Sequence, residues 1–267
     1  MLSSKLDNIK EVRVIEKNYP SIHLLGVRID DLPLDTLVNL IVHKSKLGEK
    51  VTAAYVNIYA LNLAYEKPWF KDWLNASDIA YCDGYGARIG ARLLGLDLTN
   101  RNTPPDWIDS LASACASQGL SIFFLGGQAG VAELAAGRLS HNHPDLRIAG
   151  VQHGYFEKTY RSAESARVIK SINQSDADIL LVGFGMPVQE KWLLENREGL
   201  DARVAMPVGA LFDYLGGVIP RAPRSLTKNG FEWLGRLMYE PGRLWRRYLV
   251  GAPLFFTRVL SQRLFRK

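Results

Sequence analysis

One carboxylate in the sequence stands where it could take a proton from a reacting hydroxyl group. Asp83 directly follows the apolar run IAYC and precedes a glycine, which predicts a position at the end of a buried strand, facing a cleft. A carboxylate in such a place can act as a general base. The same position also suits a helix cap, in which the carboxylate accepts hydrogen bonds from backbone N–H groups. Asp83 is therefore a candidate catalytic residue with a structural alternative.

Three more polar residues follow apolar or glycine-rich runs. Asn57 could contact a ligand or cap a helix expected from Ile58 to Glu66, and Tyr55, two residues earlier, could bind a ligand or pack in the core. Gln189 follows the open loop GFGMPV and carries both a donor and an acceptor, so it could recognise a base or a sugar. Its alternative is a solvated helix start.

Other catalytic patterns are weak or missing. The segment LGGQAG, residues 125–130, is compatible with a phosphate-binding turn at a helix start, or with a tight turn that needs glycine. It lacks the full dinucleotide fingerprint and the P-loop lysine. The sequence shows neither a DxD pair nor His, Cys and Asp at metal-ligand spacing, and GxSxG is absent. We therefore expect no bound metal, no cofactor and no covalent catalysis.

The positive charge is concentrated at the C-terminal end. Residues 221–267 hold eleven Lys and Arg but only two Glu, a net charge of +9, whereas the whole chain carries +6 and residues 1–220 therefore carry −3. Arg243, Arg246 and Arg247 share a helix face by their spacing, Arg236 lies in a preceding helix, and guanidinium groups suit phosphate oxygens. An amphipathic helix with solvated charges is the alternative.

Aromatic and apolar residues are interleaved with these arginines, which favours a membrane interface over nucleic acid as the anionic partner. Leu254, Phe255, Val259 and Leu260 recur at helix-face spacing and are expected to face the lipid. Pro241 and Pro253 are placed like first-turn prolines, so three short helices are expected in this tail.

The rest of the sequence predicts the strands and helices that position these residues. Short apolar runs alternate with turns and helical spacing, which predicts an α/β fold with a mostly parallel sheet flanked by helices. Ligands in such sheets bind beyond the carboxyl ends of the strands. We expect a Rossmann-like core over residues 1–220 and a helical appendage over 221–267. A single strand is expected within Ile22–Ile29, and helices at Asp35–Lys46 and near Asp106–Gln118.

The sequence also bears on the compartment. Two cysteines, Cys82 and Cys115, form no disulfide framework, which favours a reducing compartment. Neither a signal-peptide core nor a run of eighteen apolar residues occurs. We expect a peripheral protein on the cytoplasmic face of a membrane.

At seven collinear segments the chain resembles the WecG/TagA/CpsF glycosyltransferases, over roughly residues 50–250. Any one of these motifs would be unspecific, whereas seven in the same order are highly specific. The segments are YVN and ALNLA within 55–64, CDGYGARIGARLLG at 82–95, RNTPPD at 101–106, FFLGGQAG at 123–130, VGFGMPVQEKW at 182–192, PVGALFDYLGGVIPRAP at 207–223 and GFEWLGRLMYEPGRLWRRYL at 230–249.

The resemblance implies an inverting, metal-independent transferase that forms a β-linkage from a UDP-sugar. The implied acceptor is a saccharide on a polyprenyl-diphosphate carrier, at the cytoplasmic face of the bacterial inner membrane. The implied products are precursors of exopolysaccharides or cell-wall polymers. By position, Asp83 matches the proposed base, whereas Asn57, Arg101 and Gln189 match active-site positions around the donor. Arg236, Arg243 and Arg246 match appendage arginines that reach the donor diphosphate.

Tyr55 departs from this family pattern, in which threonine is common. A bulky phenol should reshape the donor or acceptor pocket, which leaves a glucosyl, galactosyl or glucuronyl donor open beside N-acetylmannosamine. The alternatives to a glycosyltransferase are a nucleotide-binding oxidoreductase and a non-catalytic membrane adaptor. The incomplete glycine fingerprint disfavours the first, and the polar residues repeated at strand ends disfavour the second. The sequence leaves a homo-oligomer open.

Overall fold

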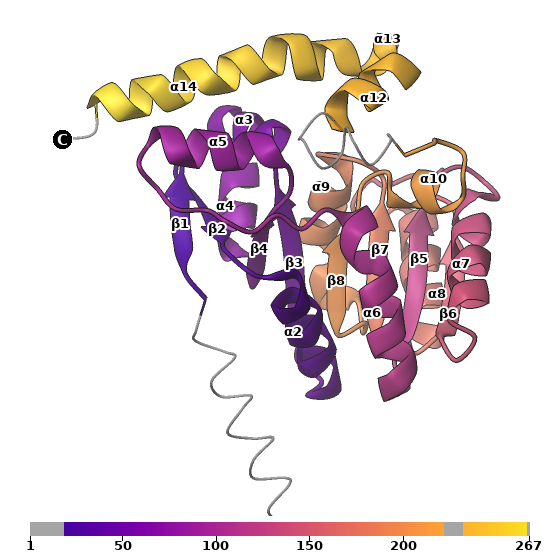
Figure 1. The fold of residues 1–267 in the computed structure, drawn as a ribbon. Helices are drawn as coiled ribbons and strands as arrows, with labels where there is room; N and C mark the ends of the chain where they lie inside the picture. Colours follow the sequence, from indigo (N-terminus) through magenta and orange to yellow (C-terminus); the bar gives the residue numbers. More distant parts are fainter. Residues whose placement is uncertain (1–18, 222–231, 266–267) are drawn as a thin grey trace, which may run out of the picture.

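The computed structural model describes residues 19–221 and 232–265. They form an α/β fold with one eight-stranded, mostly parallel sheet between helices, which confirms the predicted fold class (Figure 1). The strand order is β1-β2-β4-β3-β8-β7-β5-β6. The strands are β1 (Ser21–Leu24), β2 (Val27–Asp30), β3 (Val51–Val56), β4 (Ile79–Cys82), β5 (Ser121–Gly126), β6 (Arg147–Gln152), β7 (Ile179–Gly183) and β8 (Val204–Pro207).

The expectation of one strand across Ile22–Ile29 is wrong. Leu25 and Gly26 both adopt positive φ angles, of 52° and 79°, and reverse the chain. The segment therefore forms an antiparallel hairpin of β1 and β2 at one edge of the sheet. An alternating pattern cannot reveal such a reversal, because the alternation continues through the tight turn.

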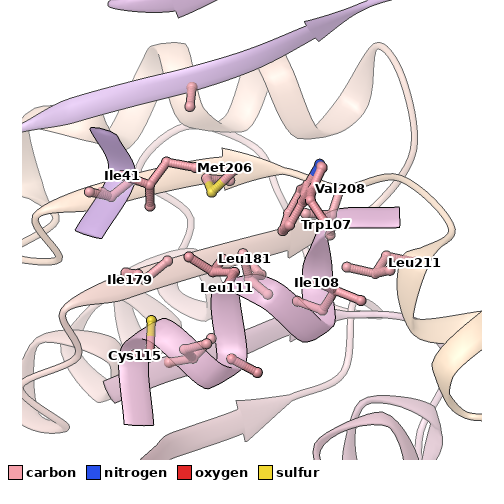
Figure 2. Close-up of a cluster of buried hydrophobic side chains, with 14 of the residues drawn as sticks. Ile41, Trp107, Ile108, Leu111, Cys115, Ile179, Leu181, Met206, Val208 and Leu211 are labelled. Atoms are coloured by element: carbon pink, nitrogen blue, oxygen red, sulfur yellow. The ribbon is translucent and has the colours of Figure 1, made fainter. Parts of the chain in front are cut away.

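Helices cover both faces of the sheet and create two apolar cores. One face carries α2 (Leu34–Lys46), α6 (Pro104–Gln118), α7 (Val131–Asn142) and α10 (Leu211–Leu215), and Figure 2 shows part of this core around α6. The other core includes residues of α3 (Ile58–Glu66), α4 (Pro68–Ala76), α5 (Tyr85–Leu93), α8 (Ala163–Gln174) and α9 (Val188–Asn196), which the short helix η1 (Arg197–Gly199) follows.

Strand β3 shows how the sheet serves both cores. Ala53 and Tyr55 belong to the first core, and Ala54 and Val56 to the second, as expected for side chains that alternate across a strand. Because β3 is buried on both faces, its sequence is a nearly continuous apolar run. The polar residue that ends it, Asn57, lies at the carboxyl edge of the sheet.

The C-terminal tail comprises α12 (Glu232–Tyr239), α13 (Pro241–Trp245), a π-helical segment η2 (Arg246–Val250) and α14 (Gly251–Phe265). Pro241 lies in the first turn of α13, as predicted. Figure 1 shows α14 lying across α3 and α5. The Arg258 guanidinium donates to the Asn62 side chain at 2.9 Å and pairs with Glu66 at 2.8 Å, which ties α14 to α3.

The apolar face of α14 is directed differently from the prediction. Phe255 and Val259 are fully buried, and a Cβ atom at Gly90 of α5 would lie 2.4 Å from the Phe255 ring. These two residues therefore attach α14 to the core and cannot face lipid, whereas Leu254 and Leu260 are exposed. Among the described residues, no helix is long and apolar enough to cross a membrane.

Candidate active site

Asp83 and Asn57 meet at the carboxyl edge of the sheet. The backbone N–H of Asp83 donates to the carbonyl oxygen of Val56 at 2.8 Å, which places the two strand ends side by side. The Asn57 side chain caps α3, accepting from the Ala60 N–H at 3.0 Å, and its Nδ2 donates to Asp83 Oδ2 at 2.9 Å. Asn57 thus caps the helix and contacts Asp83 at the same time, because the cap orients its amide toward the carboxylate.

Asp83 does not serve as a helix cap. Gly84 occupies the cap of α5, and no described side chain caps that helix. The carboxylate instead lies beside the Asn57 amide at the wall of a pocket of about 400 Å³. This is the size range of small-molecule sites.

Residues of both the core and the tail line this pocket. The core side includes strand-end residues and the loop before α6: Tyr55, Asn57, Asp83, Gly84, Tyr85, Arg101, Thr103, Gly185, Met186, Val208, Gly209 and Tyr214. The tail side includes Trp233, Arg236, Arg247, Tyr248, Ala252 and Phe256. The tail therefore completes one wall of the cavity.

Tyr55 lies in this pocket with its ring buried. Its hydroxyl accepts a hydrogen bond from Gln189 Nε2 at 3.1 Å, and burial raises the pKa of Tyr55. A Cβ atom on Gly209 would lie 2.8 Å from the Tyr55 hydroxyl, and Gly209 has φ of +57°. The pocket wall is thus fitted to the phenol, since only glycine leaves room for it there.

Gln189 is fully buried behind this wall and is not among the lining residues. Its Oε1 accepts from the backbone N–H groups of Gly185 and Gly209, each at 3.1 Å. The amide therefore connects the loops after β7 and β8. The contact with the donor that the resemblance implies for Gln189 stays a prediction.

Arg101 lines the pocket from the loop before α6. Its guanidinium pairs with Asp106 at 2.7 Å and lies over the Tyr85 ring, 5.0 Å from its centroid. Asp106 also pairs with Arg221, and these cations and hydrogen bonds lower the Asp106 pKa despite the opposing effect of burial. The carboxylate thus holds Arg101 beside the cavity.

Within the described part of the tail, two arginines reach the pocket, Arg236 and Arg247. Arg236 pairs with Glu240 at 2.9 Å and lies over the Tyr214 ring, whereas Arg247 lies over Tyr59, 4.6 Å from the ring centroid. Among the described residues Arg247 forms no ion pair, and the buried Nε of each arginine lacks a hydrogen-bond partner there. Unpaired buried donors on two cations suit an anionic ligand.

The other two predicted arginines are placed differently. Arg246 is exposed, stacks on Trp245 at 5.3 Å and does not line the pocket. Arg243 is part of α13, but its side chain lies outside the described residues. Arg247 and Tyr248 line the cavity, whereas the adjacent Arg246 does not. The sequence placed Arg247 on the basic face without choosing it for the site.

Tyr85, Tyr214, Trp233 and Tyr248 also line the pocket. Tyr85 and Tyr214 were not singled out from the sequence, whereas Trp233 and Tyr248 were among the tail aromatics expected at the membrane interface. Tyr85 lies inside the motif CDGYG, directly after the cap of α5, which was the available signal. The glycine turn at 125–130 contributes nothing to the lining. A Cβ atom on Gly126 would lie 2.4 Å from a backbone oxygen of Gly183, so the tight turn explains that glycine.

Among the described residues, no group of three His, Cys, Asp or Glu could hold a metal ion. The described lining of the cavity contains one carboxylate, Asp83, which is oriented by an amide, and the cationic groups of Arg101, Arg236 and Arg247. The carboxyl edge of a mostly parallel sheet is where α/β enzymes bind small molecules, and the cationic groups of this pocket suit an anionic ligand.

The chain belongs to the WecG/TagA/CpsF family of glycosyl transferases, whose family model matches residues 22–267. It is therefore a glycosyltransferase, and neither an oxidoreductase nor an adaptor without activity.

Curated relatives agree with this assignment. The chain is 29% identical to an N-acetylglucosaminyldiphosphoundecaprenol N-acetyl-beta-D-mannosaminyltransferase of Bacillus spizizenii over 198 residues, which is 74% of each chain. Proteins with the same name from Bacillus subtilis and Staphylococcus aureus are 28% and 24% identical, covering 72% and 91% of this chain and 72% and 93% of their own.

Proposed function

We propose that the enzyme transfers a sugar from a UDP-sugar to a polyprenyl-diphosphate-linked saccharide, with inversion to a β-linkage and without a metal ion. The names of the relatives support the acceptor, since each describes transfer to an N-acetylglucosaminyl group on diphosphoundecaprenol. The reaction would belong to the biosynthesis of a bacterial exopolysaccharide or cell-wall polymer.

One observation carries the proposal: a single pocket contains Asp83 on its core wall and Arg236 and Arg247 on its tail wall. Single displacement with inversion needs a base for the acceptor hydroxyl and positive charge for the departing diphosphate. The two kinds of group come from different parts of the chain and face the same cavity.

In the proposed mechanism, the acceptor hydroxyl attacks the anomeric carbon while the bond from that carbon to the UDP oxygen breaks. Asp83 accepts the hydroxyl proton, and its Oδ2 is kept in position by the Asn57 amide. Arg236 and Arg247 stabilise the negative charge that develops on UDP. The products are the extended lipid-linked saccharide, UDP and a proton on Asp83.

A donor screen tests this function. Purified full-length enzyme would be incubated with individual UDP-sugars and a synthetic polyprenyl-diphosphate N-acetylglucosamine, and released UDP would be measured. We expect one UDP-sugar to give UDP release that depends on the acceptor and is unchanged in excess EDTA. If no UDP-sugar supports acceptor-dependent release, the proposed reaction is wrong. Loss of activity in EDTA, restored by Mg²⁺ or Mn²⁺, would refute the metal independence.

Tyr55 is expected to help select the donor sugar, because its buried phenol lines the pocket against Gly209. Tyr55→Thr removes the ring and should change the ranking of UDP-sugars by kcat/KM, by about tenfold for at least one pair, the scale of pocket-size discrimination. The check is a comparison of kcat/KM across the donor panel. Tyr65→Thr is the matched control, since Tyr65 is exposed on α3 and outside the pocket. An unchanged ranking would place Tyr55 outside the selecting contacts.

Membrane binding should depend on apolar side chains that the tail exposes. They are Trp233, Leu234, Met238, Tyr239, Trp245, Leu249, Val250, Leu254, Leu260, Leu264 and Phe265. Together with the excess of arginines, this surface fits peripheral binding to an anionic membrane, at the cytoplasmic face where UDP-sugars are available. Deleting α14 would also expose the core around Phe255, so point variants are the sharper test.

Leu249 and Val250 are 56% and 52% exposed, and neither lines the pocket. The double variant Leu249→Ser/Val250→Ser should lower partitioning onto phosphatidylglycerol-containing vesicles about tenfold or more, because two apolar side chains no longer enter the interface. Vesicle cosedimentation measures it. Leu47→Ser/Leu134→Ser is the matched control, since these leucines are equally exposed, at 56% and 52%. Equal losses in both variants would contradict a tail-specific interface.

A further inference from the structure

The proposed mechanism does not use the buried carboxylate of Glu190. Glu190, in the first turn of α9, is 1% exposed and does not line the pocket. Its Oε1 accepts a hydrogen bond from Gln189 Nε2 at 2.7 Å, whereas its buried Oε2 has no hydrogen-bond partner among the described residues. A carboxylate removed from water with one oxygen unpaired is costly, so its presence calls for a role.

The hydrogen bonds of the neighbouring Gln189 side chain indicate this role. Gln189 Oε1 accepts from the N–H groups of Gly185 and Gly209, and Nε2 donates both to Glu190 and to the Tyr55 hydroxyl. Three of these four partners, Tyr55, Gly185 and Gly209, line the pocket. A single side chain therefore connects the ends of β3, β7 and β8 from behind the wall.

This junction works only in one orientation of the Gln189 amide. If the amide rotated by 180°, its NH₂ group would face the two backbone N–H donors, and no hydrogen bond could form with either. An ionised carboxylate only accepts hydrogen bonds, so it can face the NH₂ group and not the carbonyl oxygen. Glu190 in its charged form thus excludes the wrong orientation.

We propose that Glu190 is a positioning residue, whose carboxylate fixes the Gln189 amide and through it the arrangement of Tyr55, Gly185 and Gly209 around the pocket. This proposal takes from the proposed function only the identity of the ligand that the pocket binds. Glu190 acts through Gln189 and touches no substrate.

Glu190 can change its charge in the neutral range. Burial raises its pKa to about 7, and the hydrogen bond from Gln189 and the charge of Arg247 oppose this rise. Arg247 of the tail and Tyr55 of β3 are the other charged or titratable groups that interact with it among the described residues. A protonated carboxyl both donates and accepts, so below pH 7 Glu190 no longer adds to the preference for this orientation, and only the two backbone N–H groups oppose the flipped amide.

The test uses full-length enzyme labelled with [15N]glycine and [15N]glutamine. We expect the amide signals of Gly185 and Gly209 and the side-chain NH₂ signal of Gln189 to shift together between pH 8.5 and 6, with a midpoint near 7. In Glu190→Gln this shared titration should vanish. Glu195→Gln is the control, since Glu195 lies on the same helix and pairs with Lys191, and the signals of this variant should titrate like those of the wild type.

Activity gives a second readout with the donor that the screen selects. At pH 8, Glu190→Gln should lower kcat/KM tenfold or more, whereas Glu195→Gln should stay within twofold of the wild type. Signals of Gly185, Gly209 and Gln189 at pH 8 that are the same in Glu190→Gln as in the wild type, or a Glu190→Gln enzyme within twofold of wild-type kcat/KM, would overturn the proposal. The NMR arm needs no substrate, so a failed donor screen would count against the proposed reaction alone.

A loss of stability is not expected to cause the lower kcat/KM of Glu190→Gln at pH 8. The folded-state pKa of Glu190 is raised from its ordinary value of 4.5, so its contribution to stability is fully present below pH 4.5 and is lost as the pH rises through 7. At pH 8 the ionised group therefore destabilises the fold, and Glu190→Gln removes that charge. The variant should melt no lower than the wild type at pH 8, and a clearly lower Tm would indicate a packing role instead.

Discussion

Asp83→Asn should lower kcat by about a hundredfold or more, the typical contribution of a positioned general base. The substitution keeps the shape of the side chain, and its amide oxygen can still accept the hydrogen bond that Asn57 donates to Oδ2. The fold and the affinity for UDP should therefore change little, whereas the group that takes the proton is lost. Steady-state kinetics with the selected donor, together with calorimetric titration of UDP, measure both quantities.

Asp97→Asn is the matched control, because Asp97 is exposed in the loop after α5 and is not among the pocket residues. It should retain wild-type turnover. If Asp83→Asn turned over at a rate near that of the wild type, Asp83 would not be the base. If it lost UDP binding as strongly as turnover, the carboxylate would contribute to donor binding and not specifically to the chemical step.

The sequence predicted where Asn57 and Asp83 lie in the fold, because a polar residue directly after an apolar run is a local pattern. A polar residue directly after a buried parallel strand must lie at the carboxyl edge, and both Asn57 and Asp83 satisfy that condition. Their mutual hydrogen bond follows from the pairing of β3 with β4, and the sequence alone did not predict which residues of the two strands pair. The capping of α3 by Asn57 was one of two stated alternatives, and it occurs together with the contact to Asp83.

The tail half of the site was harder to predict, since it depends on packing between distant segments. An amphipathic helix shows an apolar face but not what covers it, so Phe255 and Val259 were assigned to lipid although they pack on the core. Gln189 shows the same limit in the core. Its four hydrogen-bond partners are Tyr55 of β3, Glu190 of α9 and the loop residues Gly185 and Gly209, and no pattern within one segment predicts such a set of contacts.

Variants of Arg246 and Arg247 test which of these two arginines of the tail contacts the donor diphosphate. Arg247 lines the pocket over Tyr59, whereas Arg246 is exposed and stacks on Trp245. The resemblance to the family implies Arg246 as a diphosphate contact, and the geometry favours Arg247. The adjacent residues have the same charge and side-chain shape and differ in whether they reach the pocket, so each is the natural control for the other.

Arg247→Ala should lower kcat/KM by about 10²–10³, the loss found when a group that stabilises transition-state charge is removed. Arg246→Ala should stay within about threefold of the wild type on the same soluble acceptor analogue, which removes membrane binding as a cause. Both variants should bind phosphatidylglycerol vesicles to a similar degree, since each loses one positive charge, worth about 1 kcal/mol near an anionic surface. If Arg246→Ala carried the larger loss of kcat/KM, the tail would have to rotate about its axis when the donor binds. Equal, small effects of both would refute a role for η2 in catalysis and would leave Arg101 and Arg236 as the described pocket arginines available to the diphosphate.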